Sequence, residues 1–265
     1  MSPSAADGKI VLDIAPPIAT ITIDRAADQN RFRRVDIERL GEIVAALGAD
    51  ETIHAVIVTG AGDEFFSAGL LNPEIRGSLP KNEILDFVFL ANRVFDAVEA
   101  LPQIVIAAIN GTVMAGAVEL ALACDIRLVA DHAKLSMPEA KWGGFPGAGG
   151  PVRLPMVVGH GHAMDLIGTG REIDAGEMAR IGLVEHVYPR SALREAAYTI
   201  AETIGLNGPL ATRGAKRISR VRRDAGFVAS RALSDALRHA LEWSADVDEG
   251  IAAHRENRTA RFIGR

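Results

Sequence analysis

The chain has 265 residues, enough for one large domain or for one domain with an appendage. Apolar residues make up 48% and charged residues 24% of the chain, and the net charge of −5 gives no overall attraction to nucleic acid or to an anionic membrane. The single cysteine, Cys124, excludes a disulfide within the chain and favours a reducing cytoplasm, and no apolar run is long enough to span a membrane.

The N-terminal part of the chain predicts a hairpin followed by a helix. Residues 1–7 lack a basic region followed by an apolar stretch, so we expect no secretory signal. Strands are predicted at 9–14 and 18–24, joined through Pro16-Pro17. A helix is predicted over 35–48. Its apolar face holds Ile37, Leu40, Ile43, Val44 and Leu47.

The middle of the chain alternates apolar strand patterns with helical patterns. In chain order we predict a strand at 54–60, a helix at 81–100, a strand at 103–109, a helix from Val113, a strand at 125–130, a helix at 155–168, a short helix at 174–181 and a strand at 183–188. From Ser191 onward the pattern is almost entirely helical. This alternation favours an α/β fold with parallel strands. We expect a core over 1–190 that carries the candidate site, and a helical region over 191–265 that caps the core or packs on another subunit.

Glu119 is the most informative residue, because it is a lone carboxylate inside the apolar run 113–124. Burying a carboxylate is costly unless it is paired or used in chemistry. Gly116 lies near the start of the predicted helix, where backbone N–H groups lack partners, and Glu119 follows one turn later on the same side. A free amide beside a carboxylate can polarise a carbonyl and move a proton. The alternative is a structural glutamate satisfied by a neighbouring arginine or amide.

Three segments rich in small residues would have to converge around Glu119. They are 65–70, 110–119, and 137–139 with the glycine-rich run 145–150. Small residues let a ligand approach the backbone closely, and Pro146 followed by glycines is typical of a helix start whose N–H groups face an oxygen. Taken singly, the glycine run is equally consistent with a tight turn, and Glu139 after a proline is more consistent with a solvated loop carboxylate.

Together these segments resemble the enoyl-CoA hydratase/isomerase (crotonase) family, over residues 10–262. The most specific match is the run Pro146-Gly147-Ala148-Gly149-Gly150 with the upstream pair Pro138-Glu139. Further matches are 66–69, 106–111, 119–125, Arg153-Leu154, 169–171, 182–184 and Glu249-Gly250. The resemblance implies a crotonase-like spiral of ββα units with a C-terminal helical region for capping and oligomerisation, assembled as a homotrimer or homohexamer.

The resemblance also implies a site. The family binds acyl-CoA thioesters and stabilises an enolate with two backbone amides, which by motif position belong to Leu70 and Gly116. Glu119 and Glu139 match the two glutamates that flank the substrate double bond in the family's hydratases. Glu119 would take a proton from water as hydroxyl attacks the β-carbon, and Glu139 would deliver a proton to the α-carbon. The implied substrate-binding positions are Arg31, Ala68, Leu70, Leu71, Gly116, Pro138 and Gly147.

The implied function is a cytoplasmic enoyl-CoA hydratase that adds water across a trans-2 double bond. It needs no metal or redox cofactor, because coenzyme A is part of the substrate, and it has no nucleic-acid or membrane partner. We expect residues 71–80 to form a loop that shapes the acyl pocket. Arg31 falls in the region that lies near the coenzyme A nucleotide in the family, so it would either meet a phosphate or be exposed.

Two alternatives to hydration stay open. A relative could use the same enolate for isomerisation or C–C bond cleavage, or the chain could be a non-catalytic acyl-CoA-binding member of the family. Leu70-Leu71 stand where the family often has Ala-Asp, and Asn257 stands where a coenzyme A-contacting lysine is frequent. These departures allow the non-catalytic alternative, whereas the intact Glu119, Gly116 and Glu139 argue against it.

Two other features have weaker functional interpretations. His160 and His162 have a spacing that could bind a metal, but no third ligand is evident, so a structural or solvated role is favoured. A basic run could contact phosphate or RNA, but it lacks interleaved aromatic residues, so a solvated helix face is favoured. The run consists of Arg213, Lys216, Arg217, Arg220, Arg222 and Arg223.

Overall fold

The computed structural model describes residues 9–224, 244–256 and 258–265. Residues 1–7, Asn257 and part of the predicted helical region therefore lie outside the described residues. No helix in the described ranges is long and apolar enough to cross a membrane.

The main sheet has six strands in the order β1-β2-β3-β5-β7-β10. Its strands are β1 (Ile10–Ala15), β2 (Ile18–Ile23), β3 (Ala55–Gly60), β5 (Ile104–Ile109), β7 (Ile126–Ala130) and β10 (His186–Tyr188). Strand β1 is antiparallel to β2, and the remaining neighbours are parallel. The predicted hairpin, the parallel α/β pairing and the central strands are thus confirmed. Near-continuous apolar runs such as β3 and β5 are typical of parallel strands buried on both faces.

A second sheet of short strands was not predicted. It has the order β4-β6-β8-β9, with β4 (Phe65–Ser67), β6 (Thr112–Met114), β8 (Lys134–Ser136) and β9 (Glu172–Asp174). The predicted helix from Val113 is therefore wrong at its start, because the chain first forms β6 and then α4 (Gly116–Ala123). Strands of three residues are too short for a period-2 pattern to reveal.

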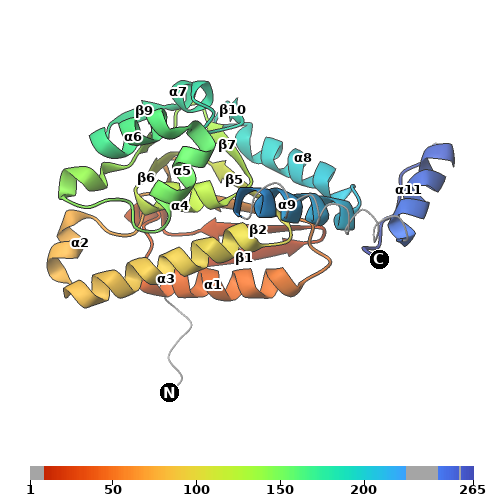
Figure 1. Cartoon of the computed structure of the whole chain (residues 1–265), viewed down its shortest axis with the longest axis horizontal. Helices are drawn as coiled ribbons and strands as arrows, with labels where there is room; N and C mark the ends of the chain where they lie inside the picture. The colour runs from red at the N-terminus through yellow and green to blue at the C-terminus, as the bar shows by residue number, and fades with distance from the viewer. Residues whose placement is uncertain (1–8, 225–243, 257) are drawn as a thin grey trace, which may run out of the picture.

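Helices cover both sides of the main sheet. The predicted helices over 35–48 and 81–100 are confirmed as α1 (Arg34–Ala49) and α3 (Lys81–Ala100), which lie side by side at the bottom of Figure 1. Helix α8 (Leu193–Gly205) packs on β2, β3, β5 and β7. The remaining described α-helix of the C-terminal part, besides α9 below, is α11 (Ala245–Glu256), which lies at the edge of the molecule beside the C-terminus (Figure 1).

The helix predicted over 155–168 is two helices. Helix α5 (Gly150–Val158) and helix α6 (His160–Thr169) are separated by Gly159, whose φ of 80° and ψ of 160° end the first helix. The short predicted helix at 174–181 is α7 (Ala175–Arg180), and residues 73–78, expected in a loop, form the short helix α2 (Pro73–Ser78). His160 and His162 are exposed at the start of α6, and no cluster of three metal-ligating side chains occurs among the described residues.

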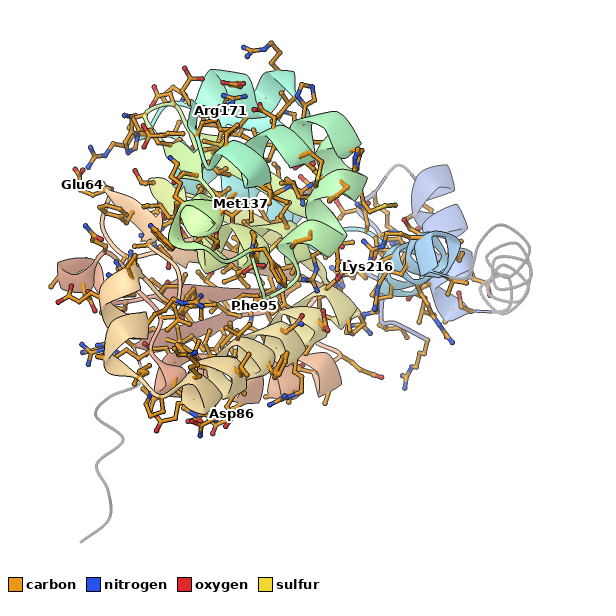
Figure 2. All side chains as sticks on the ribbon, turned by 60° about the vertical axis from the view of Figure 1, so that its left-hand side comes forward. Glu64, Asp86, Phe95, Met137, Arg171 and Lys216 are labelled. Carbon is orange, nitrogen blue, oxygen red and sulfur yellow. The ribbon has the colours of Figure 1, made fainter. Side chains whose placement is uncertain are left out.

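The basic run lies on α9 (Pro209–Asp224), and the interpretation of it as a solvated face is wrong for several members. Lys216 is buried, and its Nζ donates to Asp125 Oδ2 (2.6 Å) and to the carbonyl oxygen of Gln103 (2.8 Å). Arg213 donates to the carbonyl oxygens of Glu51 and Ile53. In Figure 2, Lys216 lies where α9 meets the body of the molecule. These cations therefore dock the helical region onto the core.

Replacing Lys216 with Met is expected to lower the free energy of unfolding by about 1.5–3 kcal/mol, the usual worth of hydrogen bonds to a charged group. The loss arises because Asp125 and the Gln103 carbonyl would both lose the hydrogen bond from the Lys216 ammonium. Urea unfolding measures it. Arg217→Met is the matched control, because Arg217 is an exposed cation on the same helix. Equal stability of the two variants would mean that the ion pair does not stabilise the fold.

Candidate active site

The backbone segments that follow β4 and β6 approach each other closely. Gly69 follows β4 with a φ of +82°, and a Cβ built on it would lie 2.7 Å from the carbonyl oxygen of Met114 and 3.0 Å from the nitrogen of Gly116. Only glycine fits such a close approach at a positive φ. The residue after it, Leu70, thereby comes against Gly116, whose own Cβ would overlap the Leu70 side chain. Leu70 and Gly116, the two residues whose amides the family resemblance implies, are thus neighbours.

The turn before α4 leaves the Gly116 amide available. Ala115 has a φ of 50° and a ψ of −127°, an unfavourable conformation for a residue with a side chain, and such conformations cluster at functional sites. Its N–H donates to the carbonyl oxygen of Ser136 on β8 (3.0 Å). Gly116 is the first residue of α4, so its N–H has no partner inside the helix. Among the described residues, the Leu70 N–H has no acceptor either.

Glu119 is 2% exposed and lies one turn into α4. Its Oε1 accepts hydrogen bonds from the N–H groups of Ala148 (2.8 Å) and Gly150 (2.7 Å), which belong to the glycine run that leads into α5. The neighbouring amides thus satisfy the carboxylate as the structural alternative supposed, but Glu119 also lines a cavity. Burial, reinforced by the charge of Glu139, raises the pKa of Glu119 to about 8.

Glu139 is buried, so its interpretation as a solvated loop carboxylate is wrong. It lies in the short 3₁₀-helix η2 (Pro138–Trp142), which Met137 anchors in the interior (Figure 2). Its Oε2 is shielded from solvent and has no hydrogen-bond partner. Burial raises the pKa of Glu139 to about 7, against a smaller lowering by the nearby charge of Arg76. An unpartnered buried carboxyl oxygen in a cavity is suited to hold a water or a substrate atom.

One cavity of about 250 Å³ joins these groups. Of the predicted site residues, it is lined by Leu70, Leu71, Gly116, Glu119, Glu139 and Gly147. The other predicted positions, Arg31, Ala68 and Pro138, do not line it. Arg31 is half-buried and donates to the carbonyl oxygen of Ala68 (3.3 Å), and Pro138 is a buried residue at the start of η2.

Four further residues at or behind the cavity were not predicted as site residues from the sequence. Arg76, Trp142 and Phe145 line it, and Arg153 lies behind it. The Arg153 guanidinium is buried and donates to Glu99 (2.8 Å), to Asp96 and to the carbonyl oxygen of Ala148 (3.2 Å). It therefore fixes the turn whose amides hold Glu119. Arg153 could have been predicted, because it lies one turn into the helix that follows the glycine run and within a family match. Arg76 could not, because its segment carries no motif.

Comparisons with known proteins agree with this architecture. The model of the family described as enoyl-CoA hydratase/isomerase matches residues 13–265. Crotonyl-CoA hydratase of Syntrophomonas wolfei is 35% identical over 260 residues, covering 97% of this chain and 98% of that protein. Short-chain-enoyl-CoA hydratase of Clostridium acetobutylicum is 36% identical over 208 residues, covering 78% of this chain and 79% of that protein.

Solved structures give the same result. The crystal structure of enoyl-CoA hydratase from Bacillus anthracis has a TM-score of 0.94 and 35% identity, covering 97% of this chain and 100% of that one. The crotonase-like fold and the family resemblance are thereby confirmed. With its two amides and two buried glutamates gathered in one cavity, the chain belongs to the enoyl-CoA hydratase/isomerase family.

Proposed function

We propose that this chain is an enoyl-CoA hydratase that adds water across the trans-2 double bond of an acyl-CoA thioester. The observation that carries the proposal is the pair of buried carboxyl groups, Glu119 and Glu139, in the cavity that the Leu70 and Gly116 residues also line. The relatives named as hydratases support it.

In the proposed mechanism the thioester carbonyl accepts hydrogen bonds from the Leu70 and Gly116 N–H groups, which makes the β-carbon electrophilic. Glu119 takes a proton from a water molecule as its oxygen bonds to the β-carbon, and the double-bond electrons move into the enolate. Glu139 then gives its proton to the α-carbon. The carboxyl pair starts and ends with one proton. These steps call for no cofactor, and we expect the chain to act as a homotrimer or homohexamer in the cytoplasm.

The test is the loss of conjugated-thioester absorbance on addition of the chain to crotonyl-CoA and to a longer trans-2-enoyl-CoA. Hydration removes the conjugation and yields the 3-hydroxyacyl-CoA, which chromatography identifies. Disappearance of substrate into a different product would instead indicate isomerisation or cleavage. Tight binding without turnover would indicate a non-catalytic acyl-CoA-binding protein.

The pH profile of kcat/KM for hydration is expected to be bell-shaped, with limbs near pH 7 and pH 8. Below about 7 both carboxyls are protonated and above about 8 both are ionised, so the one-proton form of the pair is populated between these values. The higher pKa of Glu119 places that proton mainly on Glu119, and the mechanism uses the less populated form in which Glu139 holds it. The two limbs belong to the interacting pair rather than to either residue alone. Initial rates in buffers from pH 5.5 to pH 9.5 measure the profile. A flat profile over this range would contradict the two-carboxyl mechanism.

A further inference from the structure

Arg76 places a cation at the cavity that the Leu70 and Gly116 residues also line. It lies on α2, its side chain is exposed, and it lines the cavity together with Glu139 and Gly144. Its Nη1 lies 3.6 Å from where a Cβ on Gly144 would stand, and the Gly144 N–H donates to the carbonyl oxygen of Glu139 (3.0 Å). The guanidinium therefore lies over the turn that carries Glu139.

No acceptor in the described ranges binds Arg76, neither by a hydrogen bond nor by an ion pair. Two other arginines of the chain are paired: Arg153 with Glu99, and Arg171 with Asp165 and Glu177. Glu139 attracts Arg76 only at longer range, and the raised pKa of Glu139 leaves it partly neutral near pH 7. The donors of Arg76 are thus available to a ligand in the cavity.

Apart from Arg76, Glu119 and Glu139, the side chains that line the cavity are largely apolar. They include Leu71, Ile84, Val88 and Phe145, which suit an aliphatic chain. In the proposed mechanism the thioester is held at Leu70 and Gly116 and the double bond lies by the glutamates. The part of the acyl chain beyond the β-carbon then lies against these apolar residues, in the cavity that Arg76 also lines. A guanidinium is suited to a carboxylate, which it can bind through two parallel hydrogen bonds.

We propose that Arg76 binds a carboxylate at the far end of the acyl chain, so that the preferred substrates are short trans-2-enoyl-CoA thioesters that end in a carboxylate. This inference rests on the proposed hydratase function and names its substrate class. An anionic ligand could equally be a phosphate of coenzyme A, and the experiment separates the two sources.

The experiment compares acyl groups of equal length that differ only in the terminal carboxylate. Hydration is measured with trans-2-pentenoyl-CoA and glutaconyl-CoA, and binding is measured by calorimetry with the saturated pentanoyl-CoA and glutaryl-CoA. The variants are Arg76→Met and Arg76→Lys. Arg93→Met is the matched control, because Arg93 is an exposed arginine on α3 that does not line the cavity.

Arg76→Met is expected to lower kcat/KM for glutaconyl-CoA, and the affinity for glutaryl-CoA, about 10–150-fold relative to the uncharged partner of each pair. Arg76→Lys is expected to retain part of the preference, because it keeps the charge but loses the paired donors. Arg93→Met should change neither ratio. The ratio is the informative quantity, because any effect of Arg76 on Glu139 alters both substrates alike.

Equal losses for charged and uncharged acyl groups would overturn the proposal and indicate that Arg76 binds a coenzyme A phosphate or supports Glu139. Unchanged ratios in Arg76→Met would overturn it as well. If the parent protein hydrates neither substrate, the hydratase function fails, yet the calorimetric preference for glutaryl-CoA still tests Arg76 separately.

Discussion

Glu119→Gln is expected to lower kcat for crotonyl-CoA hydration by about 10²–10⁴-fold, the range found for removal of a general acid or base. Glutamine keeps an oxygen that accepts from the N–H groups of Ala148 and Gly150, so the position is held while the proton acceptor is lost. Residual activity would come from the amides that polarise the carbonyl. Assays of the conjugated-thioester absorbance at high enzyme concentration measure the residual rate.

Glu139→Gln is expected to cause a loss of similar size, because the proposed mechanism needs both carboxyls in one turnover. The double variant should be little worse than either single one, since residues that act as a unit are not additive. Glu83→Gln is the control, an exposed carboxylate on α3 outside the cavity, and it should keep full activity. Retention of more than a tenth of the parent activity in either cavity variant would sink the two-carboxyl mechanism.

Stability measurements separate the expected loss of activity in Glu119→Gln from a loss caused by unfolding. Because burial raises the pKa of Glu119 from 4.5 to about 8, its contribution to stability is full below pH 4.5 and is lost as the pH rises through 8. Glu119→Gln lacks this titration. The melting temperature of the variant should therefore fall less than that of the parent between pH 6 and pH 9. If Glu119→Gln is inactive and loses less stability than the parent protein at alkaline pH, Glu119 is a residue kept for chemistry rather than for stability.

Long periodic segments of the fold could be predicted from the sequence. The five apolar residues expected on one face of the first helix are all buried in α1, and the predicted limits of α3 match the structure. The second sheet could not be predicted, because strands of three residues such as β6 and β8 are defined by pairing with distant strands rather than by a local pattern. The break at Gly159 between α5 and α6 was not predicted either, although Gly159 and Gly161 interrupt the apolar pattern there.

In the candidate site, too, features with a local sequence pattern could be predicted, and features set by distant contacts could not. The burial of Glu119 followed from its apolar neighbours, whereas Glu139, which follows a proline, looked like a solvated residue until β8 and η2 placed it in the interior. Arg31 was predicted either to meet a phosphate or to be exposed; it is half-buried and donates to the Ala68 carbonyl, a contact that no local pattern encodes. Convergence of segments that are far apart in the chain is a tertiary property, and only the family resemblance anticipated it.

Gly116→Ala is expected to lower kcat for hydration by about 10²–10³-fold, the usual cost of losing one donor of an oxyanion site. A Cβ at this position would overlap Cδ1 of Leu70 and lie 2.8 Å from its Cγ. Leu70 must then move, and the two proposed donors separate at the place where the thioester oxygen would lie. Alanine is otherwise favourable in α4, so the helix itself should persist. Initial rates with saturating crotonyl-CoA measure the effect, and circular dichroism verifies the helix content.

The control for this variant is Gly161→Ala on α6, where an added Cβ meets nothing within 4 Å. It should keep full activity and gain about 0.5–1 kcal/mol of stability from the better helix former. The informative outcome is the split of kinetic constants. A fall in kcat with little change in KM indicates lost stabilisation of the enolate, because that interaction strengthens only as charge develops on the oxygen. A rise in KM alone would mean that the Leu70 and Gly116 amides only bind the substrate, and the proposed oxyanion site would then have to lie elsewhere.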